Sequence, residues 1–262
     1  MISVVFCSVD SARAQSIERH YHALFADEPH EMIAIRDARS LAEGYNRGLD
    51  RAAGDIVIFS HDDIEFLDPA SWLPRLKVHL AAFDLVGLAG TTRLVSAAWA
   101  QAGPPYTFGQ VGELDGRVEQ FRVLLCAVPA PVVPDIQAVD GLFFAVRRRV
   151  IERVRFDEQT FDGFHCYDTD FSYRAHLAGF RLAVATNLPV LHASQGSFDQ
   201  KWEFYAKRFM EAHGARLARM RRRPFQHALV GAQTKEELLE IMSAPQLERS
   251  SQVPQTDPQG AG

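Results

Sequence analysis

The chain has 262 residues, of which 47% are hydrophobic and 23% are charged, values that are typical of a globular protein with a large core. Its formal net charge of −5 gives no argument for binding nucleic acid or an anionic membrane through bulk charge. The three cysteines are far apart and no segment is long enough to span a bilayer, so we expect a cytoplasmic protein without a disulfide scaffold or a zinc site.

The first 90 residues predict strands and helices in alternation. Short apolar runs predict buried strands, and apolar residues at helical spacing predict the helices between them. Ser40 and Glu43 form a capping box at the start of the second helix, and Pro69 stands at the first position of the third. The alternation predicts an α/β fold with a mainly parallel sheet and helices on both faces. The expected strands are 2–9, 31–35, 55–60 and 84–89, and the expected helices are 11–25, 40–53 and 68–83.

The second half is less regular. Residues 90–140 are rich in glycine and proline, which predicts hairpins or long loops. Beyond them we expect strands at 139–146 and 181–185, a short helix at 147–154, a helix at 168–177 and a long amphipathic helix from 197 to about 220. The last 20 residues have the composition of a disordered tail.

The tripeptide His61-Asp62-Asp63 directly follows the strand expected at 55–60. Ligands bind at the carboxyl ends of the strands in an open α/β sheet, so these side chains are well placed for a site. A divalent cation makes clustered carboxylates tolerable, and Mg²⁺ or Mn²⁺ that also binds substrate phosphates fits oxygen ligands. The alternative is a pair of loop carboxylates that water solvates.

Asp168 and Asp170 begin the helix expected at 168–177. A carboxylate that accepts a proton from a nucleophile is best held on such a rigid element. The alternative is N-terminal capping, because the helix dipole favours an anion there.

Two further positions follow or precede strands. His192 comes after an apolar run and before a glycine turn, where it could supply an imidazole to a metal beside Asp63, or could be an ordinary surface or core histidine. Asp140-Gly141 precedes an apolar strand, and its glycine would allow close approach of a ligand or would serve a turn.

The order and spacing of these motifs resemble the GT-A family 2 glycosyltransferases over residues 2–198, and within them most resemble the streptomycin-biosynthesis-like branch. SLAEGYNRGLDRAAGDIVIFSHDDIEF is similar to the segment that leads into a DxD motif, and VDGLFFAVRRRVI to the acceptor-side Asp-Gly strand. YDTDFSYRAHLAGFRLAV is similar to the ED-type signature, and LHASQGS to the terminal histidine segment. Two positions depart from the pattern, because His61 replaces the first Asp of DxD and Tyr167 replaces the Glu of ED.

The resemblance implies a GT-A fold and an inverting transfer of a sugar from a nucleotide-diphospho-sugar of the UDP, GDP or dTDP type to a hydroxyl, with Mn²⁺ or Mg²⁺. It implies one domain over 1–222, comprising a nucleotide-binding half (1–90), an acceptor half (91–198) and a C-terminal helix (199–222). Residues 223–262 would be an extension.

The same resemblance assigns roles to residues. Asp168 would be the base and Asp63 would bind the metal, and His192 would be a direct or an outer-shell partner of that metal. Asp62 would bind the donor ribose or a metal-bound water, and His61 would support the loop or touch the nucleotide. The remaining candidates are Arg36, Asp37 and Asn46 for the nucleobase and ribose, Asp140 and Gly141 for the acceptor, and Asp170 for capping and orienting its helix.

Two other functions stay open. A nucleotidyltransferase would share the fold, but SVDSARAQS after the first strand lacks the expected loop with glycine and lysine. A protein that binds nucleotide-sugars without turnover is the second alternative. Separately, Arg216, Arg219 and Arg223 would share one helical face, which predicts contact with an anionic membrane or a phosphorylated acceptor, or a solvated helix end.

Overall fold

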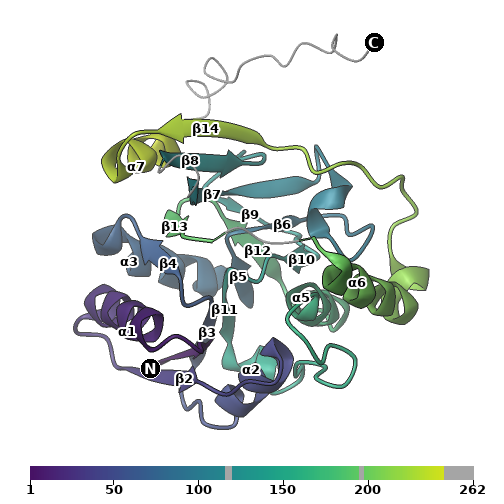
Figure 1. Ribbon diagram of the computed structural model, residues 1–262, viewed down its shortest axis with the longest axis horizontal. Helices are drawn as coiled ribbons and strands as arrows, with labels where there is room; N and C mark the ends of the chain where they lie inside the picture. Colours follow the sequence, from purple (N-terminus) through teal and green to yellow (C-terminus); the bar gives the residue numbers. More distant parts are fainter. Residues whose placement is uncertain (116–119, 195–197, 245–262) are drawn as a thin grey trace.

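The computed structural model describes residues 1–115, 120–194 and 198–244, and in these residues two mixed sheets form the centre of the fold (Figure 1). The first sheet has the strand order β2-β1-β3-β11-β5-β12-β9. Its strands are β1 (Ile2–Cys7), β2 (His30–Ile35), β3 (Ile56–Ser60), β5 (Leu85–Gly87), β9 (Val132–Val133), β11 (Phe143–Arg147) and β12 (Leu182–Ala185).

The prediction of a mainly parallel sheet is not confirmed. β2, β1 and β3 are parallel neighbours, as are β5 and β12, but β11 lies between β3 and β5 and is antiparallel to both. A parallel neighbour needs a long crossover, usually a helix. β11 instead enters directly from β10 (Ala138–Val139) in the second sheet, so it runs in the opposite direction.

Helices cover both faces of the first sheet, as predicted. Alternate side chains of β1 belong to two different hydrophobic cores, because successive residues of a strand point to opposite faces of the sheet. Val4 and Phe6 pack with α1 (Ser11–Phe25) and α3 (Pro69–Ala82), whereas Val5 packs with α2 (Leu41–Leu49) and α5 (Tyr167–Leu177). The Ser40 hydroxyl accepts a bond from the backbone N–H of Glu43, which confirms the predicted cap of α2.

The glycine- and proline-rich region contributes strands to the second sheet, and its antiparallel pair β7 (Thr107–Asp115) and β8 (Gln120–Leu125) agrees with the expectation of hairpins or long loops. No helix or strand was predicted beyond residue 220, yet β14 pairs with β8, and α7 packs against β8 (Figure 1). The elements are β4 (Ile64–Phe66), β6 (Ala89–Thr91), β7 (Thr107–Asp115), β8 (Gln120–Leu125), β10, β13 (Val190–His192), β14 (Ala228–Ala232) and α7 (Lys235–Ser243).

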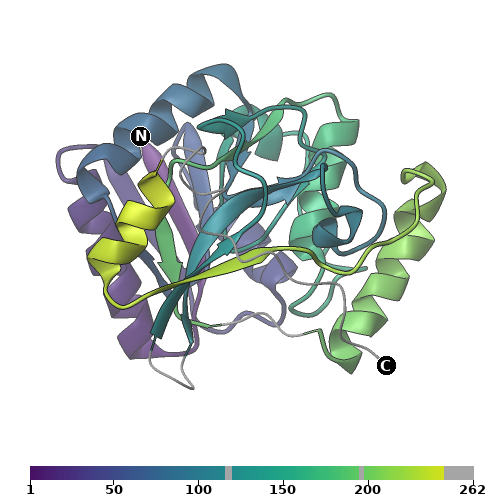
Figure 2. The same ribbon diagram turned by 90° about the horizontal axis from the view of Figure 1, so that it is seen from above.

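The long C-terminal helix is shorter than predicted. α6 spans Gln200–His213, a short 3-10 turn η2 spans Gly214–Arg216, and the chain then crosses the molecule without helix to reach β14 (Figure 2). Arg219 and Arg223 therefore do not share a helical face with Arg216, and that prediction is wrong. Arg223 instead donates a 2.7 Å bond to the carbonyl of Pro104. Two short elements complete the chain, η1 (Trp99–Ala102) and α4 (Arg148–Ile151).

Within the described residues, no helix combines the length and the apolar character that crossing a bilayer requires. The tail predicted to be disordered is residues 243–262. Ser243 is instead the last residue of α7, and residues 245–262 lie outside the described part of the chain.

Candidate active site

The loop that carries His61 and Asp63 joins the two sheets. It leaves the first sheet after β3 and enters the second as β4. β4 pairs with β13 in a register that sets His192 opposite Ile64, and the backbone N–H of Ala193 donates to the carbonyl of Asp63 at 3.0 Å. This pairing brings together side chains that are about 130 positions apart in the sequence.

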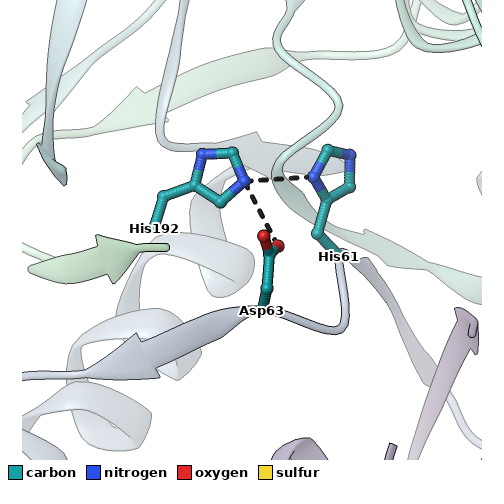
Figure 3. A group of neighbouring side chains, drawn as sticks. All are labelled: His61, Asp63 and His192. Atoms are coloured by element: carbon teal, nitrogen blue, oxygen red, sulfur yellow. Dashed lines mark hydrogen bonds and ion pairs between the residues drawn. The ribbon is translucent and has the colours of Figure 1, made fainter. Parts of the chain in front are cut away.

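The side chains of His61, Asp63 and His192 converge (Figure 3). One oxygen of Asp63 lies 3.2 Å from Nε2 of His192, and Nδ1 of His61 lies 3.4 Å from the same nitrogen. Each of the three offers one ligand atom, and these atoms lie within 4.8 Å of one another. Two imidazoles and a carboxylate are suitable donors for a divalent first-row ion, so these residues fit a metal.

Burial and neighbouring charged side chains both affect the pKa of Asp63. The side chains of Asp63 and His192 are only 6% and 11% exposed. Burial tends to raise the pKa of Asp63, but the interactions with His192, Ser194 and His61 together outweigh burial and hold this pKa well below its usual range. Arg13, at the start of α1, lies 4.0 Å from the other oxygen of Asp63. Asp63 is therefore an anion at neutral pH.

The Asp140-Gly141 loop lies against this group. The carbonyl of Leu142 accepts a 3.0 Å bond from the backbone N–H of His61. Asp140 accepts two bonds, one from the indole of Trp99 at 2.9 Å and one from the backbone N–H of Leu142 at 3.0 Å. The carboxylate of Asp140 is thus held in one orientation.

Asp168 lies in the first turn of α5, beside Asp140. The pKa of Asp168 is raised to about 7. Burial is the main cause of this shift, and the negative charge of Asp140 is the second. A Cβ at Gly141 would lie 2.9 Å from a carboxylate oxygen of Asp168, so only glycine fits here. Gly141 thus lies close to the side chains of Asp168 and Tyr167, and the approach of a ligand to this glycine stays a prediction.

A cavity of about 570 Å³ opens over these residues. His61, His192, Asp140 and Asp168 lie in its wall. Its volume lies in the range of small-molecule sites. Aromatic side chains form much of the remaining wall, and they come from η1, the start of α5, the start of α6 and the C-terminal segment: Trp99, Phe164, Tyr167, Phe198, Trp202 and Phe225.

Asp170 has a different environment from Asp168. It is 2% exposed, and one carboxylate oxygen receives two bonds from Arg174, at 2.6 and 2.8 Å. The other oxygen lies 2.8 Å from Nε2 of His213 at the end of α6. Asp170 does not cap α5, whose N-cap residue is Cys166. It ties α5 to α6 instead.

Four of the residues that were predicted to contact the nucleotide or its ribose do not line the cavity. Asn46 bonds through its amide to the backbone N–H and C=O of Phe156, at 3.1 and 3.0 Å. Asp37 is exposed and pairs with Arg47 at 2.7 Å, and Arg36 is exposed. Asp62 is partly buried in the loop beside His61. Among the residues that the structure describes, these four are not part of the cavity wall.

The bond between Trp99 and Asp140 was not predicted from the sequence. Trp99 stands in the glycine- and proline-rich region, where no periodicity marks its surroundings. From the sequence, Tyr167 was recognisable only as a departure from the family pattern. In the structure the phenol of Tyr167 is buried and lies 3.4 Å from Nε2 of His61.

Comparisons with known proteins bear on the family and the fold of the chain. The glycosyltransferase-like family matches residues 3–213. A curated relative, the streptomycin biosynthesis protein StrF of Streptomyces griseus, is 26% identical over 169 residues, which are 63% of this chain and 57% of StrF. This chain therefore matches little more than half the length of that relative.

Among solved structures, the mannosyltransferase PcManGT of Pyrobaculum calidifontis, in complex with GDP-Man and Mn²⁺, is similar with a TM-score of 0.50 and 12% identity. The similarity covers 85% of this chain and 65% of PcManGT, and it supports the predicted GT-A fold. Since the family match extends over most of the chain, the protein belongs to the glycosyltransferase-like family.

Proposed function

We propose that this protein transfers a sugar from a nucleotide-diphospho-sugar to a hydroxyl group of an acceptor, with Asp168 as the general base. The observation that carries the proposal is the position of Asp168 in the wall of a cavity that also contains His61 and His192. The family match, the relative StrF and the similarity to a mannosyltransferase that binds GDP-Man support it.

Asp168 has the properties that a base for this reaction needs. Its pKa of about 7 keeps a useful fraction ionised at neutral pH and makes it a stronger base than an ordinary carboxylate. It stands at the start of a helix that packs into the core, so its position is fixed. Asp140, with its orientation set by Trp99, both raises this basicity and offers an acceptor group for a hydroxyl.

Asp63 and His192 would bind the divalent ion of the reaction. Bound there, Mn²⁺ or Mg²⁺ would offset the negative charge on the diphosphate as it leaves. PcManGT was solved with Mn²⁺, which favours the same class of ion here. The nucleoside diphosphate of the donor would be UDP, GDP or dTDP.

Proton transfer to Asp168 frees the acceptor oxygen to attack the anomeric carbon. The new carbon–oxygen bond forms as the bond to the diphosphate oxygen breaks, and the nucleoside diphosphate leaves with its electron pair. A single displacement of this kind inverts the configuration at the anomeric carbon. The aromatic wall of the cavity would exclude water and so limit hydrolysis of the donor.

Release of nucleoside diphosphate from a panel of nucleotide-sugars with Mn²⁺ tests the proposal. Turnover is expected with at least one donor, and Asp63→Ala and Asp168→Asn are expected to remove it. Asp162→Asn is the matched control, because Asp162 is an exposed carboxylate outside the cavity wall that pairs with Arg208. Wild-type turnover in both site variants would contradict the proposal.

A further inference from the structure

His61 has the geometry of a third metal ligand. Ligands about 2.1 Å from an ion and at right angles to one another lie about 3.0 Å apart. The contacts at Nε2 of His192 are close to that spacing, at 3.2 Å to Asp63 and 3.4 Å to Nδ1 of His61 (Figure 3). The ring of His61 points its Nδ1 toward the centre of the group and not toward the loop or bulk solvent.

Hydrogen bonds among these side chains cannot account for all the contacts of the ring nitrogen Nε2 of His192. Nε2 of His192 faces Asp63, His61 and the hydroxyl of Ser194, which lies at 3.3 Å. A ring nitrogen of histidine carries at most one proton, so it cannot bond to all three at once. An ion at the centre would accept the lone pairs of both imidazoles and of the carboxylate together.

The second nitrogen of His61 has its own partner. Nε2 lies 3.4 Å from the phenol oxygen of Tyr167, which is also 3.5 Å from the carbonyl of Gly141. Tyr167 is 4% exposed, so water does not compete strongly for this contact. A partner of this kind on the far nitrogen fixes the tautomer and orientation of a histidine ligand. The two positions that depart from the family pattern are thus in contact with each other.

We propose that His61 is a direct ligand, that Tyr167 is its positioning residue, and that the resulting site of two imidazoles and one carboxylate prefers Co²⁺ and Mn²⁺ to Mg²⁺. The inference rests on the proposed function in that the ion is the one that the sugar transfer would use. Imidazole favours first-row transition ions, whereas Mg²⁺ favours oxygen ligands. Affinity is therefore expected to increase from Mg²⁺ to Mn²⁺ to Co²⁺.

Titration calorimetry of the metal-free protein with each ion, in the absence of any nucleotide, tests the ligand set. Wild type is expected to bind Co²⁺ at least about tenfold more tightly than Mg²⁺. His61→Ala should weaken Co²⁺ and Mn²⁺ binding far more than Mg²⁺ binding. His61→Asp, which restores an oxygen ligand, should bring the three affinities close together. The two variants differ in the size and charge of the side chain, so either one that folds decides the question.

Tyr167→Phe tests the positioning role, because it removes only the hydroxyl. Loss of an outer partner of a metal-bound histidine typically weakens binding about 10–100-fold, and we expect that loss for Co²⁺. The matched control is Tyr173→Phe on the same helix, whose hydroxyl donates to the carbonyl of Arg216. In the His61→Ala background the effect of Tyr167→Phe should disappear, since the hydroxyl acts only through His61.

Three results would overturn the inference: equal affinity of wild type for Mg²⁺ and Co²⁺, unchanged Co²⁺ affinity in His61→Ala, or an equal effect of Tyr167→Phe in both backgrounds. Turnover of nucleotide-sugars is measured separately. The expected metal preference without any turnover would contradict only the proposed function, and turnover without this preference would contradict only the present inference.

Discussion

The indole N–H of Trp99 donates a 2.9 Å hydrogen bond to Oδ2 of Asp140, and Asp140 in turn raises the pKa of Asp168. A residue of the 3-10 turn η1 thereby acts on α5, which packs against the first sheet. The bond holds the carboxylate of Asp140 in position beside Asp168.

The rate of transfer should follow the ionisation of Asp168. The base is active without its proton, so kcat is expected to rise with pH through an apparent pKa of about 7. Asp140→Asn removes one negative charge, lowers the pKa of Asp168 and should move this rise to lower pH. Stopped-time assays from pH 5 to 9 measure both profiles, and an unchanged or higher midpoint in Asp140→Asn would count against the coupling.

The same raised pKa predicts a dependence of stability on pH. The folded state holds the proton of Asp168 more tightly than the unfolded state does, so ionisation of this group destabilises the fold as pH rises from about 4 to about 7. Asp168→Asn cannot ionise, and its Tm relative to wild type should increase across this window and level off above it. Thermal unfolding at several pH values measures the difference, with Asp162→Asn as the control. A constant difference would contradict the assignment.

Asp170 should contribute to stability and not to chemistry. Asp170→Asn leaves Arg174 and His213 without their buried anion, and we expect unfolding free energy to fall by about 2–5 kcal/mol. Asp162→Asn, which breaks an exposed ion pair, should cost less than about 1 kcal/mol. Urea unfolding measures both. Specific activity of folded Asp170→Asn should remain near that of wild type, and its complete loss would assign Asp170 to the reaction.

Asn46 offers a choice between two roles. The sequence predicts contact with the nucleotide, whereas in the structure its amide bonds to the backbone of Phe156. From these bonds, Asn46→Ala is expected to lower stability by about 1–3 kcal/mol and to leave the donor KM almost unchanged. Steady-state kinetics on the folded variant distinguish the roles, since a large rise in KM would favour nucleotide binding.

The sequence predicted the first half of the fold well because its signals are local. The capping box at Ser40, the proline at the start of α3 and the short apolar runs each act within a few residues. The antiparallel direction of β11 could not be predicted in the same way. It depends on β10 pairing with β6 of the second sheet, a contact between distant segments that no local pattern encodes.

The residues of the site also divide into those marked by local signals and those whose contacts join distant segments. Asp63, Asp168 and His192 were recognisable because each stands in or beside a strand, or at the start of a helix, within a family motif. The contact of Tyr167 with His61 joins positions 106 residues apart, and only the fold shows that the two departures belong together. The pairing of Asp170 with His213 could not be predicted for a similar reason. No local signal marks the end of α6 at His213, and the helix was predicted to continue to about residue 220.

The most direct test of the account separates binding from chemistry in Asp168→Asn. Calorimetry with UDP-, GDP- and dTDP-sugars in Mn²⁺ should find a donor that wild type and variant bind with similar Kd. Turnover of that donor should fall about 10²–10⁴-fold in the variant. Turnover at the wild-type rate in Asp168→Asn would contradict the central claim, and binding without turnover by wild type across several acceptors would favour a nucleotide-sugar-binding protein.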